Sequence, residues 1–227
     1  MTNTLHRYGS SESLKDDYIV FALAARGIND KDAVEKERRF LEIARKHHPV
    51  NMGDSSRGSI FRPSKELNPT VHWRRDPALD FDGVVNGVSC VCTVAAVFDE
   101  ADNVVAFVRE LKQADLGLSI NISAALDKAR ECAKRAGIDR HSVEYSLGFF
   151  GQTDRMADRH TLELSTMCGH GMLSFNFVRK LVEWVKQGRR TPVQASATLS
   201  RFCSCGVFNP TRACRLFEEA KKGSEGR

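Results

Sequence analysis

Four potential metal ligands stand in two short stretches of the C-terminal third of the chain. Cys168 and His170 form a Cys-x-His pair, and Cys203 and Cys205 form a Cys-x-Cys pair. Thiolate and imidazole ligands in this number suit a zinc ion, and a set in which cysteine predominates also suits an iron–sulfur cluster. The two pairs therefore predict one metal centre per chain.

The two pairs occupy equivalent places in an internal repeat with an offset of 35 residues. Residues 164–188 align with residues 199–223 without a gap and share eight identical positions, where chance would give about one or two. The shared positions include the first cysteine of each pair and the glycine that follows the pair, Gly171 or Gly206. Each copy is typical of a loop that leads into a helix.

We expect the two copies to pack about a local two-fold axis, which would bring both loops to one point. Gly171 and Gly206 would then let the backbone approach the metal and donate N–H···S bonds. If only the three cysteines bind a [4Fe-4S] cluster, one iron stays open to a substrate as a Lewis acid. The one-residue spacing within each pair differs from the two-residue spacing of zinc knuckles, which disfavours a rubredoxin-like or finger-like site. The alternative to a metal centre is that these residues are small buried side chains in tight loops.

The remaining cysteines divide into one pair and two isolated residues. Cys90 and Cys92 lie in a Val-rich segment, residues 84–98, that predicts a strand, so both thiols should point to one face. That face is either core or a further source of a metal ligand or catalytic thiol. Cys132 and Cys214 lie in predicted helices beside apolar residues, which favours packing.

A second group of chemically active side chains lies in a long irregular segment, residues 49–82. His72, Arg74 and Arg75 follow one another closely there, and arginine binds carboxylates and phosphates through paired hydrogen bonds. We expect this segment to cover the metal centre and these three residues to contact a small anionic substrate. The alternative is that they belong to the solvated surface.

The elements that must position these residues predict an α/β protein, with α+β possible. We divide the chain into an N-terminal helical pair with the long loop (1–82), a small sheet of about three strands with crossover helices (83–150), and the helical repeat (151–227). The predicted helices and strands are helices 13–26, 30–47, 103–114 and 123–136 and strands 84–98, 117–122 and 141–149.

Composition limits the classes of function that fit the chain. Its 227 residues are 41% hydrophobic and 28% charged, with a formal net charge of +5, which is typical of a globular protein. Because no apolar run reaches ~18 residues and the N-terminus is polar, we expect a cytoplasmic protein without a membrane partner. The weak, dispersed charge does not favour a nucleic-acid partner, and the lack of a phosphate-binding glycine loop predicts no nucleotide cofactor.

We interpret the chain as a metalloprotein and, more specifically, as a metal-dependent enzyme. Its iron–sulfur cluster or zinc ion would support Lewis-acid chemistry, as in a lyase or hydrolase, or redox chemistry. One alternative is a non-catalytic binding or regulatory module, with a structural zinc ion and a protein partner or a second copy of the chain. Another is a thiol-based redox or metal sensor.

Overall fold

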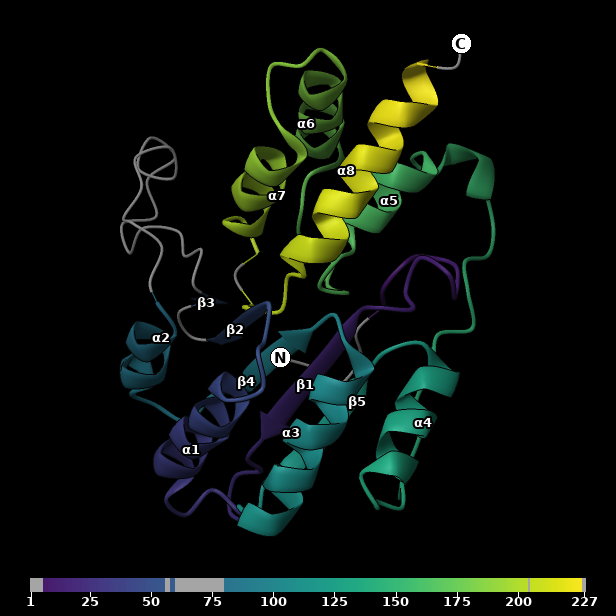
Figure 1. Cartoon of the computed structure of the whole chain (residues 1–227). Coiled ribbons are helices and arrows are strands. Elements are labelled where there is room, and N and C mark those ends of the chain that lie inside the picture. The colour runs from purple at the N-terminus through teal and green to yellow at the C-terminus, as the bar shows by residue number, and fades with distance from the viewer. Residues whose placement is uncertain (1–5, 56–57, 60–79, 204, 226–227) are drawn as a thin grey trace.

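An antiparallel sheet stands between two layers of helices (Figure 1). The structure, a computed structural model, describes residues 6–55, 58–59, 80–203 and 205–225. Within these residues the sheet has five strands in the order β3-β2-β4-β1-β5. Their bounds are β1 (Tyr18–Leu23), β2 (Asn51–Asp54), β3 (Gly58–Ser59), β4 (Val94–Phe98) and β5 (Ser119–Ser123).

Both faces of the central strands are buried. Val20 and Ala22 of β1 belong to the hydrophobic core under α1 (Ala33–Arg45) and α3 (Ala101–Ala114). Ile19 and Phe21 belong to a second core formed with the C-terminal helices. A strand buried on both faces has no polar alternation, so its sequence resembles a buried helix. The helix predicted over residues 13–26, and with it the N-terminal helical pair, is therefore wrong.

Connections between the strands make the protein α+β, with no parallel neighbours among the described strands. Helix α1 joins β1 to β2, and α3 joins β4 to β5; each of these pairs is separated by one other strand. The crossover helices are thus present, but all neighbouring strands run antiparallel. The core connectivity is that of a split βαβ sheet, whereas the sequence order of strands and helices favoured an α/β sheet.

The segment predicted as one long strand, residues 84–98, folds as a helix, a turn and a short strand. Helix α2 (Phe81–Gly87) begins after Asp80, whose side chain accepts a hydrogen bond from the backbone N–H of Gly83 at 2.7 Å. This side-chain cap stabilises the first turn in a sequence whose valines favour a strand. Only the last part of the prediction is correct, since β4 begins at Val94.

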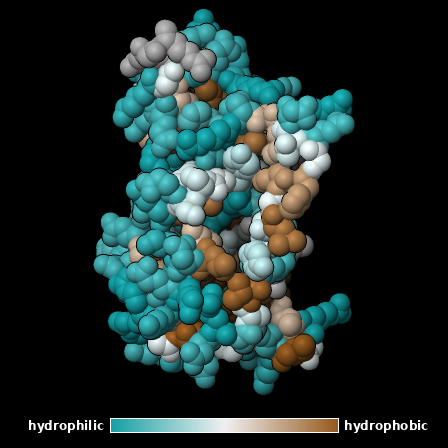
Figure 2. Space-filling view, turned by 90° about the vertical axis from the view of Figure 1, so that its right-hand side faces the viewer, coloured by the Kyte–Doolittle hydropathy of each residue, from teal (hydrophilic) through white to brown (hydrophobic). Residues whose placement is uncertain are grey.

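Helix α4 (Leu126–Arg135) confirms the predicted helix after β5, but the strand predicted over residues 141–149 is wrong. These residues are exposed and make no strand pairing, although Val143, Tyr145, Leu147 and Phe149 alternate as in a strand. Alternation identifies an extended chain but does not supply a neighbour for its backbone. Figure 2, which views this side of the molecule, shows hydrophobic residues gathered beside a hollow.

The last third of the chain is helical, as predicted, and forms the second helical layer. Its elements are a 3-10 turn (Thr153–Arg155), α5 (Arg159–Ser165), α6 (Phe175–Lys186), α7 (Pro192–Ser200) and α8 (Pro210–Glu225). Helix α8 contacts α5, α6 and α7. Across the described ranges, none of the helices combines the length and apolarity needed to cross a membrane.

Candidate metal centre

Two helix–loop–helix units carry the predicted ligands. The first loop connects α5 to α6 and contains Cys168 and His170, and the second connects α7 to α8 and contains Cys203 and Cys205. Side-chain caps stabilise the starts of the two helices of the second unit. Thr191 forms a complete capping box at the start of α7, and Asn209 accepts a hydrogen bond from the backbone of α8 at 3.0 Å.

The two loops share a left-handed glycine at the same repeat position. The backbone φ angle is 62° at Gly171 and 75° at Gly206, a conformation that glycine adopts without steric cost. A Cβ atom built on Gly171 would meet nothing within 4 Å. The backbone conformation, rather than a close approach of neighbouring atoms, therefore explains this glycine. A two-fold axis relating the units stays a prediction.

The loops bring three of the four predicted ligands into one group, and Cys203 lies beside this group without belonging to it. The ligand atoms of Cys168, His170 and Cys205 all lie within 4.8 Å of one another. The Cys203 Sγ atom lies 3.2 Å from that of Cys205 and is also hydrogen-bonded to Cys168. Around a tetrahedral zinc ion with Zn–S bonds of ~2.3 Å, sulfur atoms stand roughly 3.8 Å apart. The 3.2 Å between the sulfur atoms of Cys203 and Cys205 is shorter than this value, and the limit of 4.8 Å for Cys168, His170 and Cys205 is compatible with it.

Burial and hydrogen bonding set the protonation of the three thiols. Cys168, Cys203 and Cys205 are 0%, 1% and 7% exposed. Hydrogen bonds from the thiols of Cys203 and Cys205 lower the pKa of Cys168, and the same contacts with Cys168 raise the pKa of Cys203 and raise that of Cys205 to about 12. These hydrogen bonds favour the thiolate form at Cys168 and the thiol form at Cys203 and Cys205, and a metal ion would take the place of the thiol protons.

Backbone N–H groups also face the sulfur atoms. The backbone of His170 donates to Cys168, and the backbone of Val207 donates to Cys205. The predicted N–H···S bonds therefore come from residues beside Gly171 and Gly206. In addition, the Nδ1 atom of His170 is buried and makes no hydrogen bond, so it keeps a lone pair or proton without a partner.

The candidate centre lies in the second hydrophobic core, against the sheet. Its three cysteines pack in one cluster with Ile19 of β1 and Val97 of β4. A backbone hydrogen bond of 3.1 Å from His6 to Gly169 fastens the N-terminal segment to the first loop. A metal ion here would join two loops of the helical layer directly beneath the central strands.

The second Cys-x-Cys pair lies elsewhere. Cys90 is exposed, and Cys92 is half-buried against the core on the opposite face of the sheet. The Cys92 backbone N–H and thiol donate to the carboxylate of Glu37, and burial raises the pKa of the Cys92 thiol. Cys132 is buried in the same core, in agreement with the packing role predicted for it.

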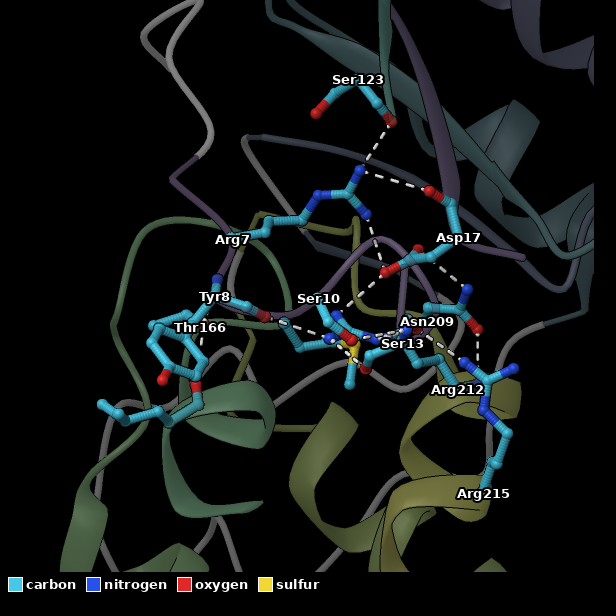
Figure 3. Close-up of polar contacts among 12 residues, drawn as sticks. Arg7, Tyr8, Ser10, Ser13, Asp17, Ser123, Thr166, Asn209, Arg212 and Arg215 are labelled. Atoms are coloured by element: carbon cyan, nitrogen blue, oxygen red, sulfur yellow. Dashed lines mark hydrogen bonds and ion pairs between the residues drawn. The ribbon is translucent and has the colours of Figure 1, made fainter. Parts of the chain in front are cut away.

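The predicted substrate contacts, His72, Arg74 and Arg75, lie outside the described residues. Sequence reasoning missed a different polar group, which is built on Asp17 (Figure 3). The Asp17 carboxylate binds Arg7 at 2.7 Å and Arg212 at 3.1 Å and accepts a hydrogen bond from Asn209 at 2.9 Å. The sequence shows only that Asp17 is an acidic residue next to an apolar segment. It does not reveal that its partners Asn209 and Arg212 lie almost 200 residues farther along the chain.

The chain matches no known family model, no curated protein and no solved structure. Its function must therefore be argued from its own residues.

Proposed function

We propose that the chain is a metalloprotein in which Cys168, His170, Cys203 and Cys205 bind one zinc ion. The observation that carries this proposal is the convergence of two buried thiols and one imidazole from two separate loops, with the third buried thiol, Cys203, 3.2 Å from Cys205. Sulfur and imidazole nitrogen are the usual ligands of zinc, and four of them complete its tetrahedral coordination. The unpartnered Nδ1 of His170 supports the same assignment.

The separations favour one ion over an iron–sulfur cluster. In a [4Fe-4S] cluster each cysteine binds a different iron, and inorganic sulfide lies between the irons, so the four ligands stand farther apart than those of one ion. Here the ligand atoms of Cys168, His170 and Cys205 all lie within 4.8 Å of one another. An iron–sulfur cluster is the main competitor, and metal analysis separates the two.

A site with four protein ligands is closed, which is typical of structural zinc. The ion would tie the α5–α6 unit to the α7–α8 unit and hold both against β1 and β4. Because metal binding to such a site contributes directly to folding free energy, the helical layer would depend on it. This supports the binding or regulatory module with a structural metal over the catalytic interpretation.

The test is elemental analysis of the full chain, purified anaerobically, with two matched variants. We expect one zinc per chain, without iron or sulfide. Cys168→Ser should lose most of the zinc, whereas Cys90→Ser, which removes an exposed thiol, should keep it. A chelator should then lower the melting temperature of the wild type and of the Cys90 variant, but not that of the Cys168 variant.

Two results would contradict the zinc assignment. Iron and sulfide in equal amounts would establish a cluster. Metal-free protein with a Cys203–Cys205 disulfide, identified by mass with and without reductant, would instead support the thiol-redox sensor, for which the 3.2 Å contact between the two sulfur atoms provides the geometry.

A catalytic metal is the second candidate function, favoured by the position of His170. His170 is half-buried, whereas the three cysteines are buried, and Met172 beside it is 54% exposed. If the imidazole exchanges for a small anionic substrate, the zinc ion gains the open position of a Lewis-acid site. The His170→Cys variant distinguishes the two candidates. A structural zinc should stay bound by four thiolates and the fold should stay stable, whereas a catalytic zinc should lose its activity because the exchangeable imidazole has been replaced.

A further inference from the structure

A cavity of about 470 Å³ lies beside the N-terminal segment, and none of the cysteines lines it. Its walls come from three places: the N-terminal segment with Arg7 and Tyr8, the extended segment with Ser146 and Phe149, and helix α5 with Arg159 and Glu163. The rings of Tyr8 and Phe149 contact each other, with centroids 5.3 Å apart. The cavity thus combines an aromatic wall with charged groups.

The lining of the cavity includes Glu163, a buried carboxylate without hydrogen-bond partners. Its side chain is fully buried, yet neither carboxylate oxygen makes a hydrogen bond. It forms an ion pair with the Nε atom of Arg159, at 3.4 Å from Oε2, and the Arg159 side chain is 55% exposed. Buried carboxylates normally accept several hydrogen bonds, because an unsatisfied buried charge is costly. This carboxylate therefore has unused capacity to accept hydrogen bonds.

The other cations nearby are already engaged. Arg7 pairs with Asp17 at 2.7 Å and donates to the backbone of Ser123 at 2.8 Å. Arg212 pairs with Asp17 and donates to backbone oxygens of Ser13 and Tyr8, each at 3.1 Å. These two guanidinium groups hold the cavity wall in place but do not hydrogen-bond to Glu163.

Gly9 fixes the approach of the N-terminal segment to this carboxylate. A Cβ atom at Gly9 would lie 2.8 Å from Nη2 of Arg212 and 3.3 Å from Oε1 of Glu163. Only a residue without a side chain fits here without displacing Arg212. The backbone therefore passes close to the carboxylate while leaving its oxygens without hydrogen bonds.

We propose that this cavity binds a small molecule through a planar group with two adjacent N–H donors, and that Glu163 accepts both. Amidinium groups, guanidinium groups and the edge of an aminopyrimidine ring have this geometry. Paired hydrogen bonds to a carboxylate are strong and directional. Tyr8 and Phe149 provide the apolar surface on which the flat part of such a molecule packs, and the half-exposed Arg159 is the group that the incoming donors displace.

The probe for this proposal is benzamidine, which carries an amidinium group on an aromatic ring; benzoate is its matched anion. Both are titrated by NMR into the full chain, with the metal content unchanged. Wild type should bind benzamidine and not benzoate. Glu163→Gln should weaken benzamidine binding about tenfold or more, since the lost hydrogen bonds are charged. Glu183→Gln, which changes an exposed glutamate of α6, should leave binding unchanged.

A variant at Arg159 should change the affinity for benzamidine in the opposite direction. Arg159→Ala removes the competing cation and should strengthen benzamidine binding. Phe149→Ala, at a residue that is 48% exposed, should weaken benzamidine binding more than that of methylguanidine, which has no ring. These two variants keep the test decisive if Glu163→Gln does not fold.

Three outcomes would overturn the assignment. Benzoate binding that depends on Arg159 would make the cavity an anion site. Equal benzamidine affinity for wild type and Glu163→Gln would remove the carboxylate from recognition. Weaker benzamidine binding by Arg159→Ala would show that Arg159 supports the ligand and is not displaced by it.

Discussion

At the scale of single residues, Glu37 is a buried acid whose pKa is shifted by its surroundings. It lies in α1, fully buried, and its carboxylate accepts the backbone N–H of Cys92 at 3.1 and 3.2 Å. Burial raises the pKa of Glu37, and the nearby Asp54 of β2 raises it further, while the two hydrogen-bond contacts with Cys92 lower it. The net direction is upward, so the folded state binds the proton more tightly than the unfolded state.

Replacing Glu37 by Gln should therefore stabilise the protein at high pH. An acidic group whose pKa is higher in the folded state stabilises the fold only at low pH. Its contribution to the free energy of unfolding is lost as pH rises from the unfolded-state pKa through the folded-state pKa, and it stays lost at higher pH. We expect the melting temperature of Glu37→Gln to exceed that of the wild type at pH 8, with the difference closing toward pH 4. The control is Glu42→Gln on the same helix, at an exposed residue that pairs with Arg39. Its difference in melting temperature from the wild type should not change in this way between pH 8 and pH 4.

At the scale of single elements, the start of α7 is specified by its own sequence. In the capping box of α7, Thr191 Oγ1 accepts from the backbone of Gln194 at 3.1 Å, and the Gln194 side chain accepts from the backbone of Thr191 at 3.1 Å. All of these partners lie within three residues. Such a motif is recognisable from sequence because its energetics depend on local geometry alone.

Thr191→Ala should lower the free energy of unfolding by about 1 kcal/mol, because it leaves a backbone N–H at the start of α7 without its side-chain partner. Denaturant unfolding measures this change. Thr198→Ala is the matched control, since Thr198 lies inside the same helix and only bonds back to the Gln194 carbonyl at 2.7 Å. A loss of equal size in both variants would mean that the cap is not the cause.

The strands are harder to predict from sequence than the helices, because the periodicity of a segment does not decide whether it becomes a strand. Strand β1 and residues 141–149 illustrate the two ways in which the prediction fails. In β1 the residues facing both sides are apolar, so strand periodicity is absent although the strand exists. In residues 141–149 the periodicity is present but the strand is not. Whether a segment becomes a strand depends on a neighbour that its own residues do not encode.

At the scale of the whole molecule, the Asp17 group connects the sheet to the helical layer. Asp17 precedes β1, Arg7 belongs to the N-terminal segment, and Arg212 lies in the first turns of α8. The side chains of Asp17 and Arg212 are fully buried, and that of Arg7 is 4% exposed. The proximity of the two cysteine loops could be predicted because each pair is local and the repeat marks it twice, while metal binding stays a prediction. Asp17 and Arg212, by contrast, are separated by 195 residues.

Asp17→Ala should destabilise the protein by about 3–5 kcal/mol, because it leaves two buried guanidinium groups without their carboxylate. The neighbouring Asp16→Ala is a close control. Asp16 pairs with Arg215 at the surface, with 47% of its side chain exposed, and exposed pairs contribute no more than ~1 kcal/mol. Similar unfolding free energies for the two variants would contradict a structural role for the buried group.

The two-sided burial of β1 also has a consequence for the order in which the protein is made. Ile19 and Phe21 leave the ribosome long before α8 (Pro210–Glu225), which helps to cover them. A nascent chain that already holds all five strands still presents one apolar face of its sheet to the surroundings. Such surfaces promote aggregation and attract chaperones. The nascent protein is thus vulnerable to aggregation between synthesis of its sheet and synthesis of α8.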